Sequence, residues 1–122
     1  EALSRGAQHV TFVEKEKNLY KNIIKNISNL GYENQIQAVC SDSFKWLKTN
    51  KQKFDLIFLD PPYKECRINF ILENIIKNKI INQKGLVILH RNKKTKDLFS
   101  DKFKIVENRT YGISKIYLIK LR

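Results

Sequence analysis

Short apolar runs alternate along the chain with longer amphipathic segments, and this alternation most restricts what the sequence can fold into. Runs rich in β-branched and aromatic residues predict strands, and segments with apolar residues three and four positions apart predict helices. Strands and helices in alternation are typical of an α/β fold with a mostly parallel sheet. The 122 residues suffice for one domain with a sizeable core, so we expect a single domain over residues 1–122.

The pattern also predicts where the individual elements lie. Strands are predicted at residues 10–14, 36–40, 54–59, 85–90, 104–108 and 113–121. Helices are predicted at residues 17–30, 43–49 and 68–79, with a polar helical turn near 95–99. The last two strands are expected to form an antiparallel C-terminal hairpin that turns at Tyr111 and Gly112. The strand at 54–59 is almost entirely apolar, as in strands covered on both faces, so we place it centrally in the sheet.

The tetrapeptide Asp60-Pro61-Pro62-Tyr63 follows this apolar strand and carries the sharpest chemical signal. Neither proline can donate a ladder hydrogen bond, so the strand must end here and a stiff loop must begin. An exocyclic amine on a purine is a poor nucleophile because its lone pair is delocalised. A carboxylate and a backbone carbonyl that accept its two N–H groups favour the pyramidal nitrogen of the transition state. Asp60 and the Pro61 carbonyl can supply these acceptors, and Tyr63 can stack on a base. The alternative is that the tetrapeptide has only a structural role, in which it ends the strand in a turn and the Tyr63 ring fills space in the fold.

Two further acidic residues follow predicted strands. Glu14 ends the strand at 10–14, and Asp42 lies two positions after the strand at 36–40. Ligands of doubly wound sheets bind beyond the carboxyl ends of parallel strands, so we expect both residues and Asp60 at one edge. Glu14 can accept hydrogen bonds from ribose hydroxyls, or it can be a solvated member of a charged run. Asp42 can accept from an adenine amino group, or it can cap the helix at 43–49. The histidines His9 and His90 are isolated in the sequence, and we expect neither to be catalytic.

The charge of the chain points to an anionic partner. The net charge is +12, of which residues 61–122 contribute +10, with 15 basic and 5 acidic side chains. Lysine supplies 19 of the 24 cations, and A/T-rich coding could produce that bias without selection. Coding bias does not explain the asymmetry, so we expect the second half to face a polyanion. The candidate phosphate-binding residues follow the strand at 85–90 or flank the hairpin: Arg91, Lys93, Lys94, Lys96, Arg109 and Lys115. The alternative is that these cations lie on a solvated surface and bind no phosphate.

The tetrapeptide resembles the amino-methyltransferase signature of S-adenosylmethionine-dependent class I enzymes. The opening residues 1–7, the run 10–14 and the hairpin resemble more narrowly the bacterial 16S ribosomal-RNA guanine-N2 methyltransferases. This resemblance implies a Rossmann-like class I methyltransferase fold. It also implies methyl transfer from S-adenosylmethionine to guanine N2 in ribosomal RNA, free or in an assembling small ribosomal subunit, without a metal. Glu14 would hold the cofactor ribose, Asp42 its adenine, and residues 60–63 the guanine.

Two other functions stay open at this point. Adenine-N6 DNA methylases share the tetrapeptide, and a noncatalytic nucleic-acid-binding remnant would also be basic. No apolar stretch is long enough for a spanning helix and no signal peptide is visible, so we expect a cytoplasmic protein without a membrane partner.

The chain departs from the family at its beginning. Members of that family start with an arm and a strand ending in a glycine-rich loop, ahead of the helix whose end resembles residues 1–7. None of the four glycines, Gly6, Gly31, Gly85 and Gly112, forms such a loop. We therefore expect a partial domain that lacks the N-terminal strand and loop. Alone, such a chain should bind the cofactor weakly and be inactive.

Overall fold

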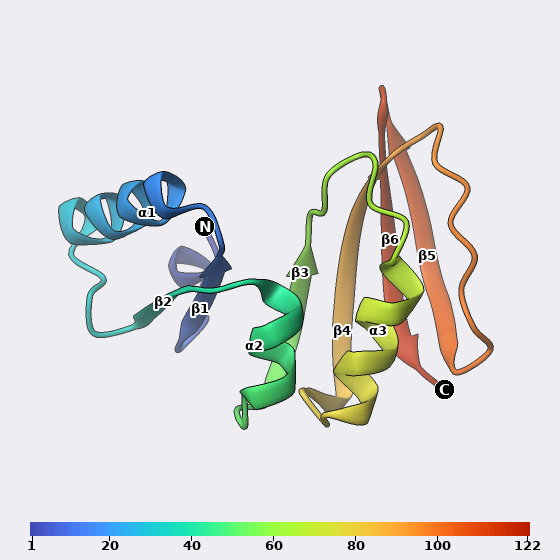
Figure 1. Cartoon of the computed structure of the whole chain (residues 1–122), viewed down its shortest axis with the longest axis horizontal. Helices are drawn as coiled ribbons and strands as arrows, with labels where there is room; N and C mark the ends of the chain where they lie inside the picture. Colours follow the sequence, from blue (N-terminus) through green and yellow to red (C-terminus); the bar gives the residue numbers. More distant parts are fainter. The chain divides into compact units, whose positions relative to one another are not determined.

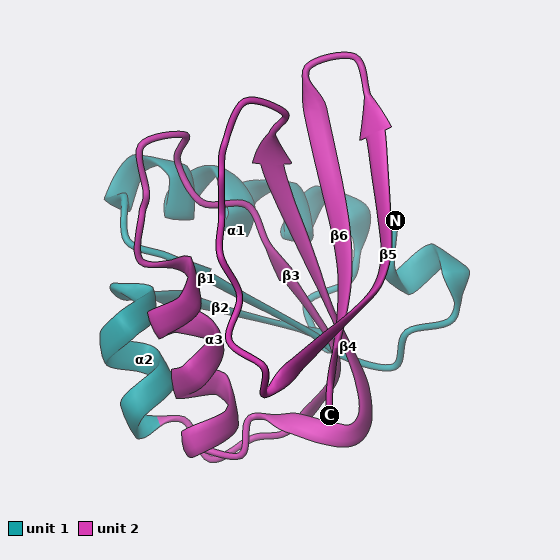
Figure 2. Cartoon of the chain, turned by 90° about the vertical axis from the view of Figure 1, so that its right-hand side faces the viewer, with its two compact units in different colours: residues 1–49 teal, residues 50–122 magenta.

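The computed structural model describes all 122 residues, which fall into two compact units. Unit 1 comprises residues 1–49 and unit 2 residues 50–122 (Figure 2). No helix in either unit has both the length and the apolar character that crossing a bilayer requires.

Unit 1 contains a two-stranded parallel sheet and two helices (Figure 1). Its elements are a short 3-10 turn at Leu3–Arg5, β1 (Val10–Glu14), α1 (Lys17–Leu30), β2 (Ile36–Cys40) and α2 (Ser43–Thr49). The two strands pair in parallel from Val10 opposite Ile36 to Glu14 opposite Cys40. Gly31 ends α1 at a φ of +75°, in the left-handed region that side chains disfavour. The parallel register brings the carboxyl ends of β1 and β2 to one edge.

Unit 2 contains a four-stranded mixed sheet in the order β3-β4-β6-β5 and one helix (Figure 1). Its elements are β3 (Phe54–Leu59), α3 (Ile68–Lys77), β4 (Ile81–Asn92), β5 (Phe103–Tyr111) and β6 (Ser114–Leu121). The β3 and β4 strands are parallel, whereas β6 runs antiparallel to both β4 and β5. The predicted C-terminal hairpin is therefore confirmed, and it turns at Gly112 with a φ of +57°.

The core of unit 2 lies between α3 and one face of this sheet (Figures 1 and 2). Six aliphatic side chains are almost fully buried: Ile68, Leu72, Ile75, Ile80, Leu89 and Ile119. Burial of each stabilises the fold by about 1.5–3 kcal/mol relative to exposure. Burial alternates along β4, so Val87, Leu89 and Arg91 are buried in turn. The period-2 geometry of the strand thus carries the charged Arg91 onto the same face as the apolar core residues.

Two predictions about unit 2 are wrong. The first concerns β3, which is an edge strand because β4 is its only neighbour, and Leu56 and Phe58 are 52% and 61% exposed. An apolar run shows that a strand can be covered, but it does not show how many strands pair with it.

The second concerns residues 95–99, which form no helical turn. Tertiary contacts replace the local hydrogen bonds of a turn in this segment. The carbonyl of Thr95 accepts a hydrogen bond from Lys115 Nζ at 2.9 Å, and Asp97 binds Arg91. Phe99 packs edge-on against Tyr117, with 5.1 Å between the ring centroids.

Candidate functional site

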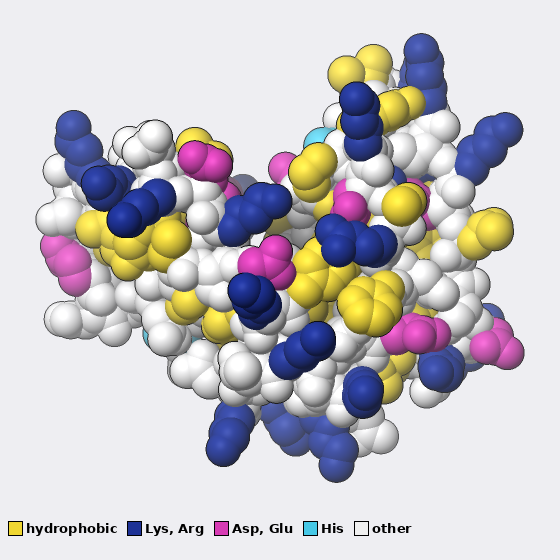
Figure 3. Space-filling view, viewed as in Figure 1, with side chains coloured by type: hydrophobic (Ala, Val, Ile, Leu, Met, Phe, Trp, Pro, Cys, Tyr) yellow, Lys and Arg dark blue, Asp and Glu magenta, His cyan; other side chains and the backbone are white.

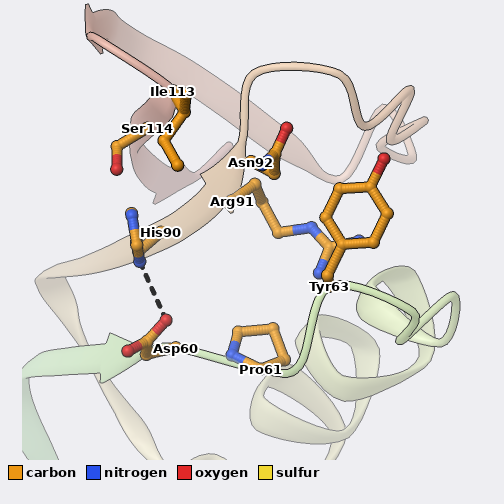
Figure 4. Close-up of a pocket in the computed structure, with 8 residues that line it drawn as sticks. All are labelled: Asp60, Pro61, Tyr63, His90, Arg91, Asn92, Ile113 and Ser114. Atoms are coloured by element: carbon orange, nitrogen blue, oxygen red, sulfur yellow. Dashed lines mark hydrogen bonds and ion pairs between the residues drawn. The ribbon is translucent and has the colours of Figure 1, made fainter.

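A cavity of about 180 Å³ opens in unit 2 at the carboxyl ends of β3 and β4 (Figure 4). Its lining residues are Asp60, Pro61, Tyr63, His90, Arg91, Asn92, Ile113 and Ser114. Three parts of the chain supply them: the loop after β3, the end of β4, and residues 113–114 at the start of β6. The parallel β3–β4 pair therefore places the candidate tetrapeptide where ligands of α/β sheets bind.

Asp60 is paired with a histidine from the neighbouring strand. Its Oδ1 lies 2.8 Å from Nδ1 of His90, and the dashed line in Figure 4 marks this contact. The Asp60 side chain is 60% exposed and that of His90 is 33% exposed. Only one oxygen of the carboxylate is engaged by the protein. The second oxygen, Oδ2, is free to accept a hydrogen bond from a ligand.

The loop that follows Asp60 is held from inside the fold by Arg91. The Nη1 group donates to the carbonyl of Pro62 at 3.2 Å, and Nη2 donates to the carbonyl of Glu65 at 2.7 Å. Nε and Nη2 also donate to the carboxylate of Asp97, at 2.8 and 3.1 Å. The expectation that Arg91 contacts RNA phosphates is therefore wrong. Its side chain is only 3% exposed, and its donors are used within the protein.

The rim of the cavity is partly apolar. Tyr63 is 55% exposed and Ile113 is 69% exposed, although both side chains are large and hydrophobic. Figure 4 shows the Tyr63 ring, the Pro61 ring and the Ile113 side chain around the opening. The site thus combines a carboxylate with exposed apolar surface, which suits a planar ligand that also donates hydrogen bonds.

Glu14 and Asp42 lie together at the carboxyl edge of the unit 1 sheet. Glu14 ends β1, and one of its oxygens accepts from the N–H of Glu16 at 2.9 Å. Asp42 follows β2, and its Oδ1 accepts from the N–H groups of Phe44 and Lys45 at 2.9 and 3.2 Å. Asp42 therefore caps α2, as the helix-cap interpretation predicts. Each carboxylate keeps a second oxygen that can accept from a ligand.

The predicted phosphate-binding cations differ in how available they are. Lys93, Lys94 and Lys96 are exposed. Lys115 is half-buried: its Nζ donates to the Thr95 carbonyl and lies 5.1 Å from the centre of the Tyr117 ring.

Arg109 is already paired on the surface. Its Nε and Nη2 bind Glu107 at 2.6 and 3.0 Å, and the hydrogen bond to this carboxylate raises the pKa of Arg109. On the face shown in Figure 3, Lys and Arg side chains surround the end of unit 2 that holds the β5–β6 turn, with hydrophobic side chains between them.

His90 lines the cavity although it is not among the predicted site residues, and the same holds for Asn92, Ile113 and Ser114. His90 is 30 positions away from Asp60, and no local motif contains it. A signal was nevertheless present, because His90 ends the predicted strand at 85–90, and residues at the carboxyl ends of neighbouring parallel strands converge.

Comparison with known proteins matches the chain to one family model and to several named relatives. The family model described as "Conserved hypothetical protein 95" matches residues 1–120. The protein named Ribosomal RNA small subunit methyltransferase D from Buchnera aphidicola is 30% identical over 95 residues, covering 77% of this chain and 49% of that protein. The protein of the same name from Haemophilus influenzae is 28% identical over 116 residues, covering 93% of this chain and 60% of that protein. The chain thus spans about half or somewhat more of the length of these relatives.

Solved structures match the fold over almost the whole chain. A conserved hypothetical protein from Streptococcus pyogenes gives a TM-score of 0.89 at 24% identity, covering 98% of this chain and 76% of that one. A Haemophilus influenzae protein provisionally described as a methylase gives a TM-score of 0.86 at 25% identity, with the same coverage. These matches confirm the α/β fold expected of class I methyltransferases.

Proposed function

The chain belongs to the family described as "Conserved hypothetical protein 95", and on that premise we propose that it acts in S-adenosylmethionine-dependent methylation of ribosomal RNA. The proposed target is the N2 amine of a guanine in the 16S RNA of the small subunit. One observation carries the proposal: an exposed carboxylate, Asp60, has a free oxygen at an open cavity beside Pro61. The names of the ribosomal RNA methyltransferases among its relatives support the substrate class.

The chemistry required of the site is activation of a weak nucleophile. In the proposed complex, Oδ2 of Asp60 accepts one N–H of the guanine amine, and the carbonyl oxygen of Pro61 accepts the other. These two bonds favour the pyramidal geometry in which the lone pair is localised on nitrogen. S-adenosylmethionine, when bound, supplies a methyl group on a sulfonium whose neutral thioether leaves readily, so no metal is needed. The nitrogen becomes positively charged as it gains the methyl group, and Asp60, which accepts one of its N–H groups, can take the surplus proton.

The residues proposed for the cofactor fit its hydrogen-bond donors. S-adenosylmethionine offers two ribose hydroxyls and an adenine amino group. Glu14 and Asp42 each present an oxygen that the backbone does not use, at the carboxyl edge of the unit 1 sheet. We assign Glu14 to the ribose and Asp42 to the adenine, in addition to the role of Asp42 as a helix cap.

The remaining features suit an RNA substrate. Tyr63 offers an exposed ring on which an extruded guanine can stack. Lys93, Lys94 and Lys96 follow β4 and are exposed, so they can neutralise the phosphates that flank the target nucleotide. Substrates of this kind, free 16S RNA or an assembling small subunit, would place the protein in the cytoplasm.

The test is a methyl-transfer assay that separates the competing substrates. Full-length protein is incubated with S-adenosylmethionine labelled in the methyl group and, separately, with small-subunit particles, free 16S RNA or duplex DNA. Digestion to nucleosides identifies the product. The expected result is labelled N2-methylguanosine from RNA. Labelled N6-methyladenine from DNA would instead support DNA methylation, and absence of label from every substrate would support a noncatalytic nucleic-acid-binding protein.

A further inference from the structure

We propose that His90 is a positioning residue for Asp60. It holds one oxygen of the carboxylate so that the other is presented to the substrate amine. The pairing rests on the geometry of the site, whereas the contribution to catalysis rests on the proposed function.

The backbone brings the two residues together. β3 and β4 are parallel with Leu59 opposite Leu89, so Asp60 and His90 are the next residues along this register. β4 is in turn fixed by β6, in which Ile116 lies opposite His90. The 2.8 Å contact between Nδ1 and Oδ1 therefore follows from strand pairing and does not depend on a flexible loop reaching across the site.

Asp60 needs such a partner because it lies on the surface. A carboxylate that is 60% exposed can rotate about its last side-chain bond, and each rotation changes which oxygen faces the cavity. An ionised carboxylate only accepts hydrogen bonds, so Nδ1 of His90 must carry a proton in the pair. That bond occupies Oδ1 and fixes the plane of the carboxylate, leaving Oδ2 for the amine. In Figure 4 the other ring nitrogen of His90 points toward Ser114 and away from Asp60.

A first experiment tests the pairing without any assay of activity. A nitrogen-15 NMR spectrum of the imidazole rings in the full-length protein reports the histidine signals, and the H90N and H9A substitutions assign those of His90 and His9. We expect Nδ1 of His90 to carry the proton in the neutral ring. We also expect D60A to shift the His90 signals and to leave those of His9 unchanged. Protonation of His90 at Nε2, or His90 signals that do not respond to D60A, would overturn the pairing.

A second experiment tests the contribution to catalysis in the full-length protein. Replacing His90 by Ala should lower kcat by about tenfold or more, the effect of losing a hydrogen bond to a charged group, with KM for S-adenosylmethionine unchanged. Replacing it by Asn should restore most of kcat, because the amide nitrogen of Asn can donate from nearly the position of Nδ1. Replacing it by Gln, whose amide lies nearer the position of Nε2, should not. His9→Ala is the matched control and should retain wild-type turnover.

The outcomes separate the two proposals. Equal kcat values for wild type and H90A would overturn the positioning role while leaving the proposed function intact. Failure of H90N to exceed H90A, with both folded, would also overturn it. If the wild-type protein methylates no RNA, the proposed function fails and the catalytic role of His90 fails with it. The NMR experiment still decides whether the pair exists.

Discussion

Arg91 and Asp97 form a buried ion pair, with Nε and Oδ2 2.8 Å apart and only 3% and 9% of their side chains exposed. The pair joins the end of β4 to the segment that leads to β5. The same guanidinium binds the carbonyls of Pro62 and Glu65, so it also anchors the loop that carries the candidate tetrapeptide. A cation predicted to bind RNA is thus part of the internal framework of the site.

Replacing Arg91 by Ala should strongly destabilise unit 2. The substitution leaves the Asp97 carboxylate buried without a partner and two loop carbonyls without donors. Loss of one member of a buried pair costs about 3–5 kcal/mol. The free energy of unfolding, measured by urea denaturation, should fall by this amount. Arg91→Lys should also lose stability, since an ammonium cannot reproduce the planar fork that binds Asp97 and both carbonyls.

A double variant distinguishes the stability contribution from the anchoring of the loop. Arg91→Met with Asp97→Leu removes both charges and keeps much of the volume, so most of the lost stability should return. The loop carbonyls would still lack their donors, so methyl transfer by the full-length protein should stay impaired. A double variant with wild-type turnover would show that the loop does not need Arg91.

Asp60→Ala should abolish methyl transfer and leave cofactor binding unchanged. The substitution removes the acceptor that localises the amine lone pair, and the loss of one electrostatic contact of this kind costs about 100-fold or more in kcat. Asp60 lies in unit 2, whereas the proposed cofactor residues Glu14 and Asp42 lie in unit 1. Single-turnover kinetics and calorimetric titration with S-adenosylmethionine measure the two quantities. Normal turnover by D60A would rule out the mechanism.

Local periodicity predicted most of the elements, because each depends on residues close in sequence. The predicted and observed bounds of β1, α1, β2, α2 and β3 coincide. α3 ends two residues earlier than predicted, and Lys79 adopts a left-handed φ of 54° shortly after its end. These differences concern only where α3 ends, and residues 60–63 still follow β3 as predicted.

The contacts that build the site depend on residues far apart in the sequence. Asp60 was predicted from its own tetrapeptide, but its partner His90 is 30 positions away. The burial of Arg91 depends on Asp97, which lies in a segment whose polar residues suggest a helical turn. Composition identifies Arg91 as a cation and does not show that its donors bind Asp97 and the loop carbonyls. Only the register of β3 with β4 and the path of residues 93–102 determine these pairs.

Glu14→Ala should weaken binding of S-adenosylmethionine about tenfold or more in Kd, since a hydrogen bond to a charged group is lost. Glu16→Ala is the matched control. It removes the same charge two positions away and keeps the backbone N–H that holds Glu14. Calorimetric titration of the two full-length variants compares them directly. Equal loss of affinity in both would indicate a general effect of charge, and no loss in E14A would remove Glu14 from the cofactor site.

Asp42 caps α2 and is also proposed to bind the cofactor, and a conservative variant distinguishes these two roles. Asp42→Ala removes the cap of α2 and should lower the free energy of unfolding by about 1 kcal/mol. Asp42→Ser keeps an oxygen that can cap the helix, so it should retain most of that stability. Both variants lack the carboxylate and should bind S-adenosylmethionine more weakly than wild type. Wild-type affinity in D42S would restrict Asp42 to its structural role.

The three exposed lysines after β4 should account for much of the salt dependence of RNA binding. The N–H of Lys93 donates to the Ile113 carbonyl at 2.8 Å, and the N–H of Lys94 donates to Asn92 Oδ1 at 2.9 Å. These bonds fix the turn beside the cavity and leave the ammonium groups in solvent. Each phosphate contact with a single strand contributes about 0.7 to the slope of log K against log salt concentration. The triple variant K93A/K94A/K96A should therefore reduce that slope by about 2.

A control must have the same charge but lie elsewhere. K17A/K21A/K25A removes three exposed lysines from α1 in unit 1 and should leave the slope nearly unchanged. Arg109→Ala should also have little effect, because Glu107 already neutralises this guanidinium. Filter binding of 16S RNA fragments at several salt concentrations gives the slopes. Equal reductions in both triple variants would mean that RNA responds to the overall net charge, and the turn after β4 would then have no special part in binding.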